Sequence, residues 1–212
     1  MDATDAAELI SEIREERAEH EADDKFRDRA AMLIALLAML LAIGSLGGGN
    51  VAEDMIHNNI KASDTWAFYQ AKNVRQTQYR IAVDQMEAQL AADAGLPPQV
   101  RADMQSTVEQ YRATIARYDD EPDPAAPGDS LRGEGKKQLS AQARGYEVLR
   151  ERAGAQDSNF DYSEVALQLA IVLGSVAILA LSRKVLMLSM GLGVIGLLLM
   201  INGFLLMVPL PF

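Results

Sequence analysis

The sequence predicts an all-α membrane protein with three transmembrane helices and a long antiparallel helical hairpin, coiled-coil-like, inserted after the first of them. Charged residues are absent from three apolar stretches, each long enough to cross a hydrocarbon core of about 30 Å. The rest of the chain is polar, and its apolar residues recur at intervals of three and four, which is typical of helices. A soluble domain would interleave the two classes of residue, so their separation into blocks indicates a bilayer.

The chain begins with an acidic segment, residues 1–29, which we expect on the cytoplasmic side of the membrane. Residues 30–49 follow as the predicted transmembrane helix 1, because twenty uncharged residues span ~30 Å as an α-helix. This stretch ends in Gly47, Gly48 and Gly49. Since glycine restricts the backbone least, we interpret the triplet as a flexible joint to the next helix.

Residues 50–164 form the predicted extramembrane hairpin domain. A first helix runs without proline or glycine to Ala94, where the run Gly95-Leu96-Pro97-Pro98 is expected to stop it. A second helix is expected over 98–118, and a third over 130–154 after a proline-rich acidic loop. A hairpin this thin buries little area, so we expect it to associate with a second copy. The seams that would pair its first two helices have a and d spacing: Tyr79, Val83, Met86 and Leu90, facing Val100, Met104, Val108, Tyr111, Ile115 and Tyr118.

Two closing crossings are predicted at residues 165–181 and 185–208, with only Ser182, Arg183 and Lys184 between them. Such a short connection predicts a tight antiparallel pair. Small residues allow helices to approach closely in a membrane, and an asparagine there hydrogen-bonds a neighbouring helix. We therefore expect helix packing at Ala170, Gly174, Gly193, Gly196 and Asn202.

The densest group of aromatic and amide side chains is the run from Ala62 to Gln76, which contains the only tryptophan. On a helix, its aromatic and polar residues point in more than one direction. Two interpretations stay open: packing within a hairpin or oligomer, or a recognition surface for a partner protein or a lipid head group. The candidate interaction motif consists of Trp66, Phe68, Tyr69, Gln70 and Lys72.

The run TWAFYQAK, from Thr65 to Lys72, resembles a bacterial inner-membrane family catalogued as domain of unknown function 4337. The resemblance extends from about Arg27 onward and includes the glycine-rich end of the first crossing and the two closing crossings. It implies a multi-pass protein of the bacterial inner (plasma) membrane. No activity, and no role for any residue, comes with it.

Basic residues flank the crossings on one side only: Lys25, Arg27, Arg29, Arg183 and Lys184. Because positive residues stay on the cytoplasmic side, the N-terminus is predicted to be cytoplasmic and residues 50–164 periplasmic. The flanks on the other side of the membrane are acidic, in agreement with this orientation.

Composition narrows the classes of function. The chain has no cysteine, which excludes disulfides and thiolate sites, and its net charge of −10 with no basic patch argues against nucleic acid. We find no phosphate-binding loop and no nucleophile–base pattern, so we expect no enzyme, no catalytic residue, no cofactor and no metal.

The sequence therefore favours a membrane-anchored helical scaffold or protein-interaction protein. Its expected partners are the lipid bilayer, further copies of itself as a homo-oligomer, and a protein at the hairpin. The alternative is a subunit of an oligomeric channel or transporter, although none of the crossings contains the ionisable residue that ion-coupled carriers usually have.

Overall fold

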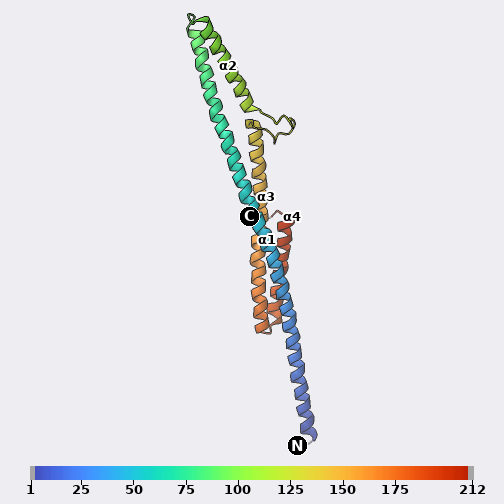
Figure 1. The fold of residues 1–212 in the computed structure, drawn as a ribbon. Coiled ribbons are helices and arrows are strands. Elements are labelled where there is room, and N and C mark those ends of the chain that lie inside the picture. Colours follow the sequence, from blue (N-terminus) through green and yellow to red (C-terminus); the bar gives the residue numbers. More distant parts are fainter. Residues whose placement is uncertain (1–2, 210–212) are drawn as a thin grey trace. The chain divides into compact units, whose positions relative to one another are not determined.

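The computed structural model describes residues 3–209, and it describes side chains at 13, 14 and 16–209. This part of the chain folds into four α-helices: α1 (Ala3–Ala92), α2 (Pro98–Asp119), α3 (Lys136–Leu179) and α4 (Arg183–Leu205) (Figure 1). The described residues contain no β-strand, which confirms the all-α prediction. Three helices, α1, α3 and α4, are long and apolar enough to cross a membrane.

The helices α1 and α3 run without a break across boundaries at which the sequence analysis divided the chain. The stop expected at Gly95 to Pro98 is present, with α1 ending two residues earlier than Ala94, and α2 begins at Pro98 as expected. The expected third helix begins at 136 rather than 130, and it continues without interruption through the second apolar stretch as α3. The helix α4 covers most of the third stretch.

The chain divides into two compact units. Unit 1 contains the residues up to Glu53 and those from Ala153 onward, and unit 2 is Asp54–Arg152. The helices α1 and α3 each contribute to both units.

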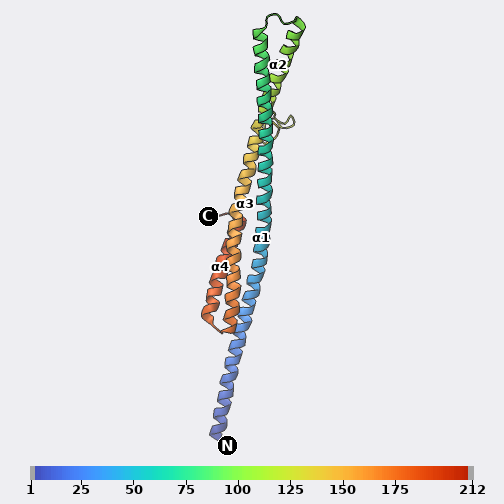
Figure 2. The ribbon, with the colours of Figure 1, turned by 90° about the vertical axis from the view of Figure 1, so that its left-hand side faces the viewer.

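Unit 1 contains parts of α1 and α3 together with α4, and α3 and α4 run beside each other (Figures 1 and 2). Its core consists of Leu37 from α1 with Leu167 and Ala170 from α3, and Leu192 of α4 packs against it. Apolar side chains from all three helices thus meet in one place.

The glycine triplet at 47–49 is not a flexible joint, because α1 runs through it without a break. Two of its glycines make room for the ring of Phe160, which α3 inserts between the helices and which is 2% exposed. A Cβ added at Gly47 would lie 2.9 Å from Phe160 Cε1, and one added at Gly48 would lie 3.1 Å from Phe160 Cβ. Phe204 of α4 packs edge-on against the same ring, with 4.9 Å between centroids. The glycines therefore serve close packing rather than flexibility.

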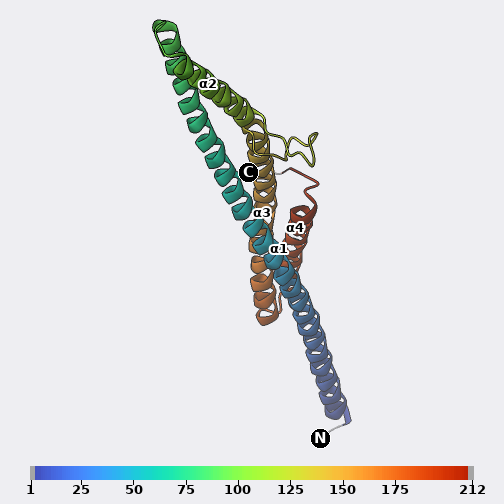
Figure 3. The same cartoon turned by 45° about the horizontal axis from the view of Figure 1, so that its top comes forward.

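Unit 2 contains the second half of α1, the whole of α2, and the start of α3. Here α2 runs back beside α1 (Figures 1 and 3). Arg101, near the start of α2, donates from Nη2 to the carbonyl of Asp93 at 2.7 Å. Further along, the rings of Tyr111 and Tyr79 meet edge-on at 4.9 Å. Residues further along α2 therefore contact residues that come earlier in α1. The coiled-coil-like hairpin stays a prediction.

Replacing Gly47 by alanine should lower the melting temperature of the detergent-solubilised protein, because the new Cβ would press on Phe160 and Phe204. Overpacking of this kind costs about 1–3 kcal/mol, and a gain in helix propensity of about 1 kcal/mol offsets part of it. Gly49→Ala is the matched control, since it gains the same propensity and its Cβ meets nothing within 4 Å. Equal melting temperatures for the two variants would contradict a packing role for Gly47.

Candidate functional site

The candidate motif lies on α1 in unit 2, and its residues divide into an inward and an outward set. Trp66 donates from Nε1 to Glu147 Oε1 on α3 at 2.9 Å, and its ring meets that of Tyr69 edge-on at 5.5 Å. Lys72 also points inward. Phe68 and Gln70 are exposed, Phe68 by 64%. The motif thus holds unit 2 together on one side and presents an aromatic ring on another.

Lys72 ties α1 to the segment that connects α2 with α3. Its Nζ lies 3.0 Å from Glu121 Oε2, and it also donates to the carbonyl of Glu134. The ring of Tyr118 lies 5.4 Å from the same nitrogen. Because the side chain is only 14% exposed, these partners replace water around the charge.

Lys136, the first residue of α3, makes a parallel set of contacts. Its Nζ lies 3.1 Å from Asp119 Oδ1 and donates to Gln76 Oε1 at 2.7 Å. The ring of Tyr69 lies 5.9 Å from this nitrogen. Gln76 is itself buried and donates from Nε2 to the carbonyl of Ile115 on α2 at 2.8 Å.

We call this group of side chains the junction, because it joins α1, the end of α2, the connecting segment and the start of α3. The junction consists of Tyr69, Lys72, Gln76, Tyr118, Asp119, Glu121 and Lys136. Its connecting segment is folded back on itself by a β-bridge between Pro122 and Gly133. Gly133 has a φ of 121°, and a Cβ at that position would overlap the Glu121 carbonyl, so this turn requires glycine.

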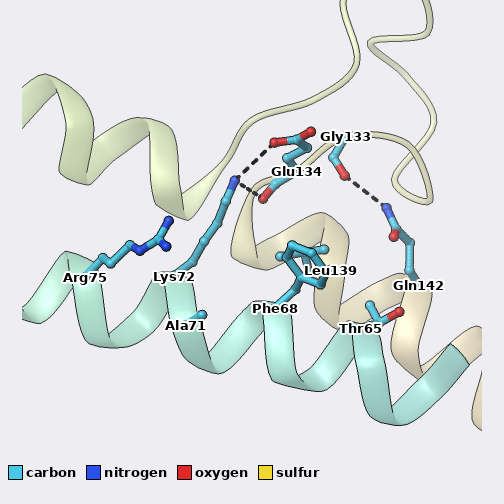
Figure 4. A pocket seen from close by; sticks show the side chains of 9 residues that line it. All are labelled: Thr65, Phe68, Ala71, Lys72, Arg75, Gly133, Glu134, Leu139 and Gln142. Atoms are coloured by element: carbon cyan, nitrogen blue, oxygen red, sulfur yellow. Dashed lines mark hydrogen bonds and ion pairs between the residues drawn. The ribbon is translucent and has the colours of Figure 1, made fainter. Parts of the chain in front are cut away.

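A cavity of about 400 Å³ opens beside the junction (Figure 4). Phe68 and Leu139 form its apolar wall, and Lys72 and Arg75 bring positive charge to it. Gln142 is held in place by donating to the carbonyl of Gly133 at 3.0 Å. Lys72 is already paired, whereas Arg75 has no ion pair within the described chain. Glu134 lines the cavity as well, so its wall combines apolar surface with side chains of both charges.

The electrostatics of the junction favour charged, structural carboxylates. The hydrogen bond from the Gln76 amide is the largest influence and holds the pKa of Asp119 below its usual value; burial opposes it, and Lys136 adds to the lowering. Hydrogen bonds from Gln138 and then Lys137 lower the pKa of Asp120. Both carboxyls are ionised at neutral pH, and a group of this kind is a poor general acid or base.

The small residues expected to pack in the membrane all lie in unit 1. Ser189 Oγ donates to the carbonyl of Ala170 at 2.6 Å. A Cβ at Gly193 would clash with Leu37, and one at Gly174 would lie 2.9 Å from Ile34.

The remaining two predicted packing residues lie further along α4. Ser163 donates to the carbonyl of Gly196 at 2.7 Å, where the side chain of Leu167 also fills the space beside the glycine. Asn202 donates to Asn159 Oδ1 on α3 at 2.8 Å. These residues bring α3 and α4 of one chain together; contacts between copies stay a prediction.

The sequence reasoning missed Gln76, Lys136 and Glu147. Gln76 could have been found, because it continues the face of α1 that carries Trp66 and Tyr69 at steps of three and four. Lys136 and Glu147 are remote in sequence, and no local pattern connects them with the motif.

The family model described as "Domain of unknown function (DUF4337)" matches residues 26–206, most of the chain and both units. No curated protein and no solved structure matches.

Lys72→Met should loosen the connecting segment, because Glu121 would lose its partly buried partner. Losing one member of such a pair costs up to about 3–5 kcal/mol. Hydrogen exchange of the Glu134 amide, which donates to the carbonyl of Glu121 at 2.9 Å, reports the change. Arg75→Met removes the same charge three residues away without breaking an ion pair. In that variant the protection of the Glu134 amide should stay at the level of the unmodified protein. Equal loss in both variants would contradict the role of Lys72.

Acid should weaken the junction through Asp119. Because its folded-state pKa is depressed, the carboxylate stabilises unit 2 above the unfolded pKa, and this contribution disappears as pH falls through the folded value. The loss should therefore begin near the ordinary value of about 3.9 and extend below it. Asp119→Asn should flatten that part of the profile of unfolding free energy against pH. An unchanged profile would show that Asp119 is not the group responsible.

Proposed function

We propose that this chain, which belongs to the family of unknown function DUF4337, is a membrane-anchored helical scaffold or protein-interaction protein that associates with itself. Unit 1 would be the anchor and unit 2 the part that meets partners. The observation that carries the proposal is the distribution of polar and apolar side chains in unit 1.

In unit 1, two serine side chains are buried between helices, whereas many large apolar side chains are exposed. Ser163 and Ser189 are fully buried and donate to backbone carbonyls. Large apolar side chains stay exposed on all three helices, including Met32 at 70% and Leu198 at 61%. In water this surface would favour aggregation, whereas lipid chains cover it at no such cost.

The proposed topology has crossings at 30–49, 165–181 and 185–208. The N-terminus faces the cytoplasm of a bacterium, because the basic residues cluster at that end of the crossings. Residues 50–164 then lie on the periplasmic side of the inner membrane, where the antiparallel α1–α2 pair forms the proposed coiled-coil-like hairpin.

Self-association is proposed for the outer face of α1 in unit 2. Ile60, Val74 and Ile81 are exposed there and lie at multiples of seven residues, the repeat by which one helix pairs with another. Asp64 and Gln78 lie on the same face and are exposed, so lipid is an unsuitable neighbour. A helix of a second copy offers both apolar and polar contacts.

A non-catalytic role fits the junction. Lys72 and Lys136, whose side chains are only 14% and 13% exposed, are each paired with a carboxylate. The pKa of Asp119 is lowered, so this carboxyl is not poised to exchange protons near neutral pH. These contacts support a structural task for the charged groups.

Cross-linking tests the self-association. Because the chain has no native cysteine, an introduced cysteine is the only thiol that can react. Val74→Cys places a thiol on the proposed face of α1, and Ala113→Cys places one on an exposed position of α2. With a short bis-maleimide added to membranes, the Val74 variant should give a band of doubled mass and the Ala113 variant should not. A monomeric Val74 variant, or equal cross-linking in both, would overturn the proposed interface.

The channel alternative gives a different result in reconstituted bilayers. A scaffold should leave the membrane electrically silent. A unitary current that depends on the protein would favour an oligomeric pore instead.

A further inference from the structure

A second cavity, of about 460 Å³, lies in unit 1 between α1 and α4. Lys25 and Arg29 from α1 and Arg183 from α4 line it. Phe26 and Met187 contribute apolar surface to the same cavity. It therefore combines three positive charges with an apolar wall, and no role described above uses it.

The two arginines of this cavity are not neutralised within the described chain. Neither Arg29 nor Arg183 makes an ion pair or a side-chain hydrogen bond with any residue that the structure describes. Lys25 lies 3.5 Å from Glu21, but both side chains are about 70% exposed, so the pairing is weak. Arg27, on another face of α1, is paired with Asp24. The cavity thus keeps an excess of positive charge even though the surrounding segment is acidic.

The start of α4 strengthens the attraction for an anion. Arg183 is its first residue, and Ser182 makes no side-chain capping hydrogen bond there. The N-terminus of a 23-residue helix carries partial positive charge and free amides, which favour phosphate.

The position of the cavity along the helices identifies the ligand class. Arg29 directly precedes the first uncharged stretch, and Arg183 lies two residues before the third. On the proposed topology the three cations lie at the depth of the lipid head groups, and Met187 and Met190 continue from them along the apolar part of α4. Basic pockets between membrane helices on the cytoplasmic side suit anionic head groups.

We propose that this cavity binds the phosphate group of an anionic phospholipid, with an acyl chain against Met187 and Met190. The inference rests on the proposed function, because it requires unit 1 to lie in a bilayer. A zwitterionic lipid presents the same phosphate beside its own cation, which the three positive side chains repel. The cavity should therefore bind a lipid whose head group has a net negative charge in preference to a zwitterionic one.

Native mass spectrometry of the full-length protein in detergent tests the site. Three probes are compared: phosphatidylglycerol, phosphatidylcholine with the same acyl chains, and inorganic phosphate. The site variant is Arg29→Gln with Arg183→Gln. The control is Arg27→Gln with Lys184→Gln, which removes two charges from the same helices at the same boundary but outside the cavity lining.

The unmodified protein should retain phosphatidylglycerol in preference to phosphatidylcholine. The site variant should bind phosphatidylglycerol on the order of tenfold more weakly, and the control should stay close to the unmodified protein. Equal loss in both variants would mean diffuse attraction to a charged surface and would overturn the site. Binding of inorganic phosphate as tight as that of the lipid would overturn the lipid as its source.

Failure of this inference differs from failure of the proposed function. A protein that alkaline carbonate releases from membranes without detergent would contradict both. A protein that stays in the membrane but shows no preference for phosphatidylglycerol would contradict the lipid site alone.

Discussion

A polypeptide surrounded by lipid has no water to satisfy its polar groups, so each of them must find a partner inside the protein. Unit 1 follows this constraint closely. Its buried hydroxyls bond to backbone carbonyls of the neighbouring helix, Ser163 to Gly196 and Ser189 to Ala170. Asn202 bonds across to Asn159, and also to the backbone of Val208 just beyond the end of α4. Among the described residues, no buried side-chain polar atom is left without a partner.

Close helix approach is what makes these bonds possible. A hydroxyl of one helix reaches the backbone of the next only where small residues bring the two near, and Gly196 provides both the space and the acceptor. Gly47 and Gly203 likewise leave space for an aromatic ring, because the ring of Phe160 packs against the backbone at both glycines. In unit 2, by contrast, the partly buried polar groups include the charged side chains of Lys72 and Lys136, and each of them is paired with a carboxylate. The two units therefore differ in the kind of polar group that they bury and in how it is compensated.

The apolar helices were predictable because runs of this length without a charged residue are typical of segments that lie in lipid. The end of the first hairpin helix was predictable from proline and glycine, which act locally. Contacts between residues far apart in the sequence were not predictable. The contact between Lys72 and Glu134, for example, depends on how the connecting segment folds back. Periodicity alone also does not predict which side chains are buried: Ala143 of α3 is fully buried, whereas Leu149, six residues further along, is 49% exposed.

Membrane anchoring by unit 1 requires lipid contact at its outer face, and a spin label can measure that contact directly. The chain has no cysteine, so Leu198→Cys carries a single nitroxide, and Gln70→Cys in unit 2 serves as the reference. In a reconstituted bilayer, the label at 198 should collide with dissolved oxygen far more readily than with a water-soluble nickel complex, and the label at 70 should show the reverse. Frequent collision of the label at 198 with the nickel complex would contradict membrane anchoring by unit 1.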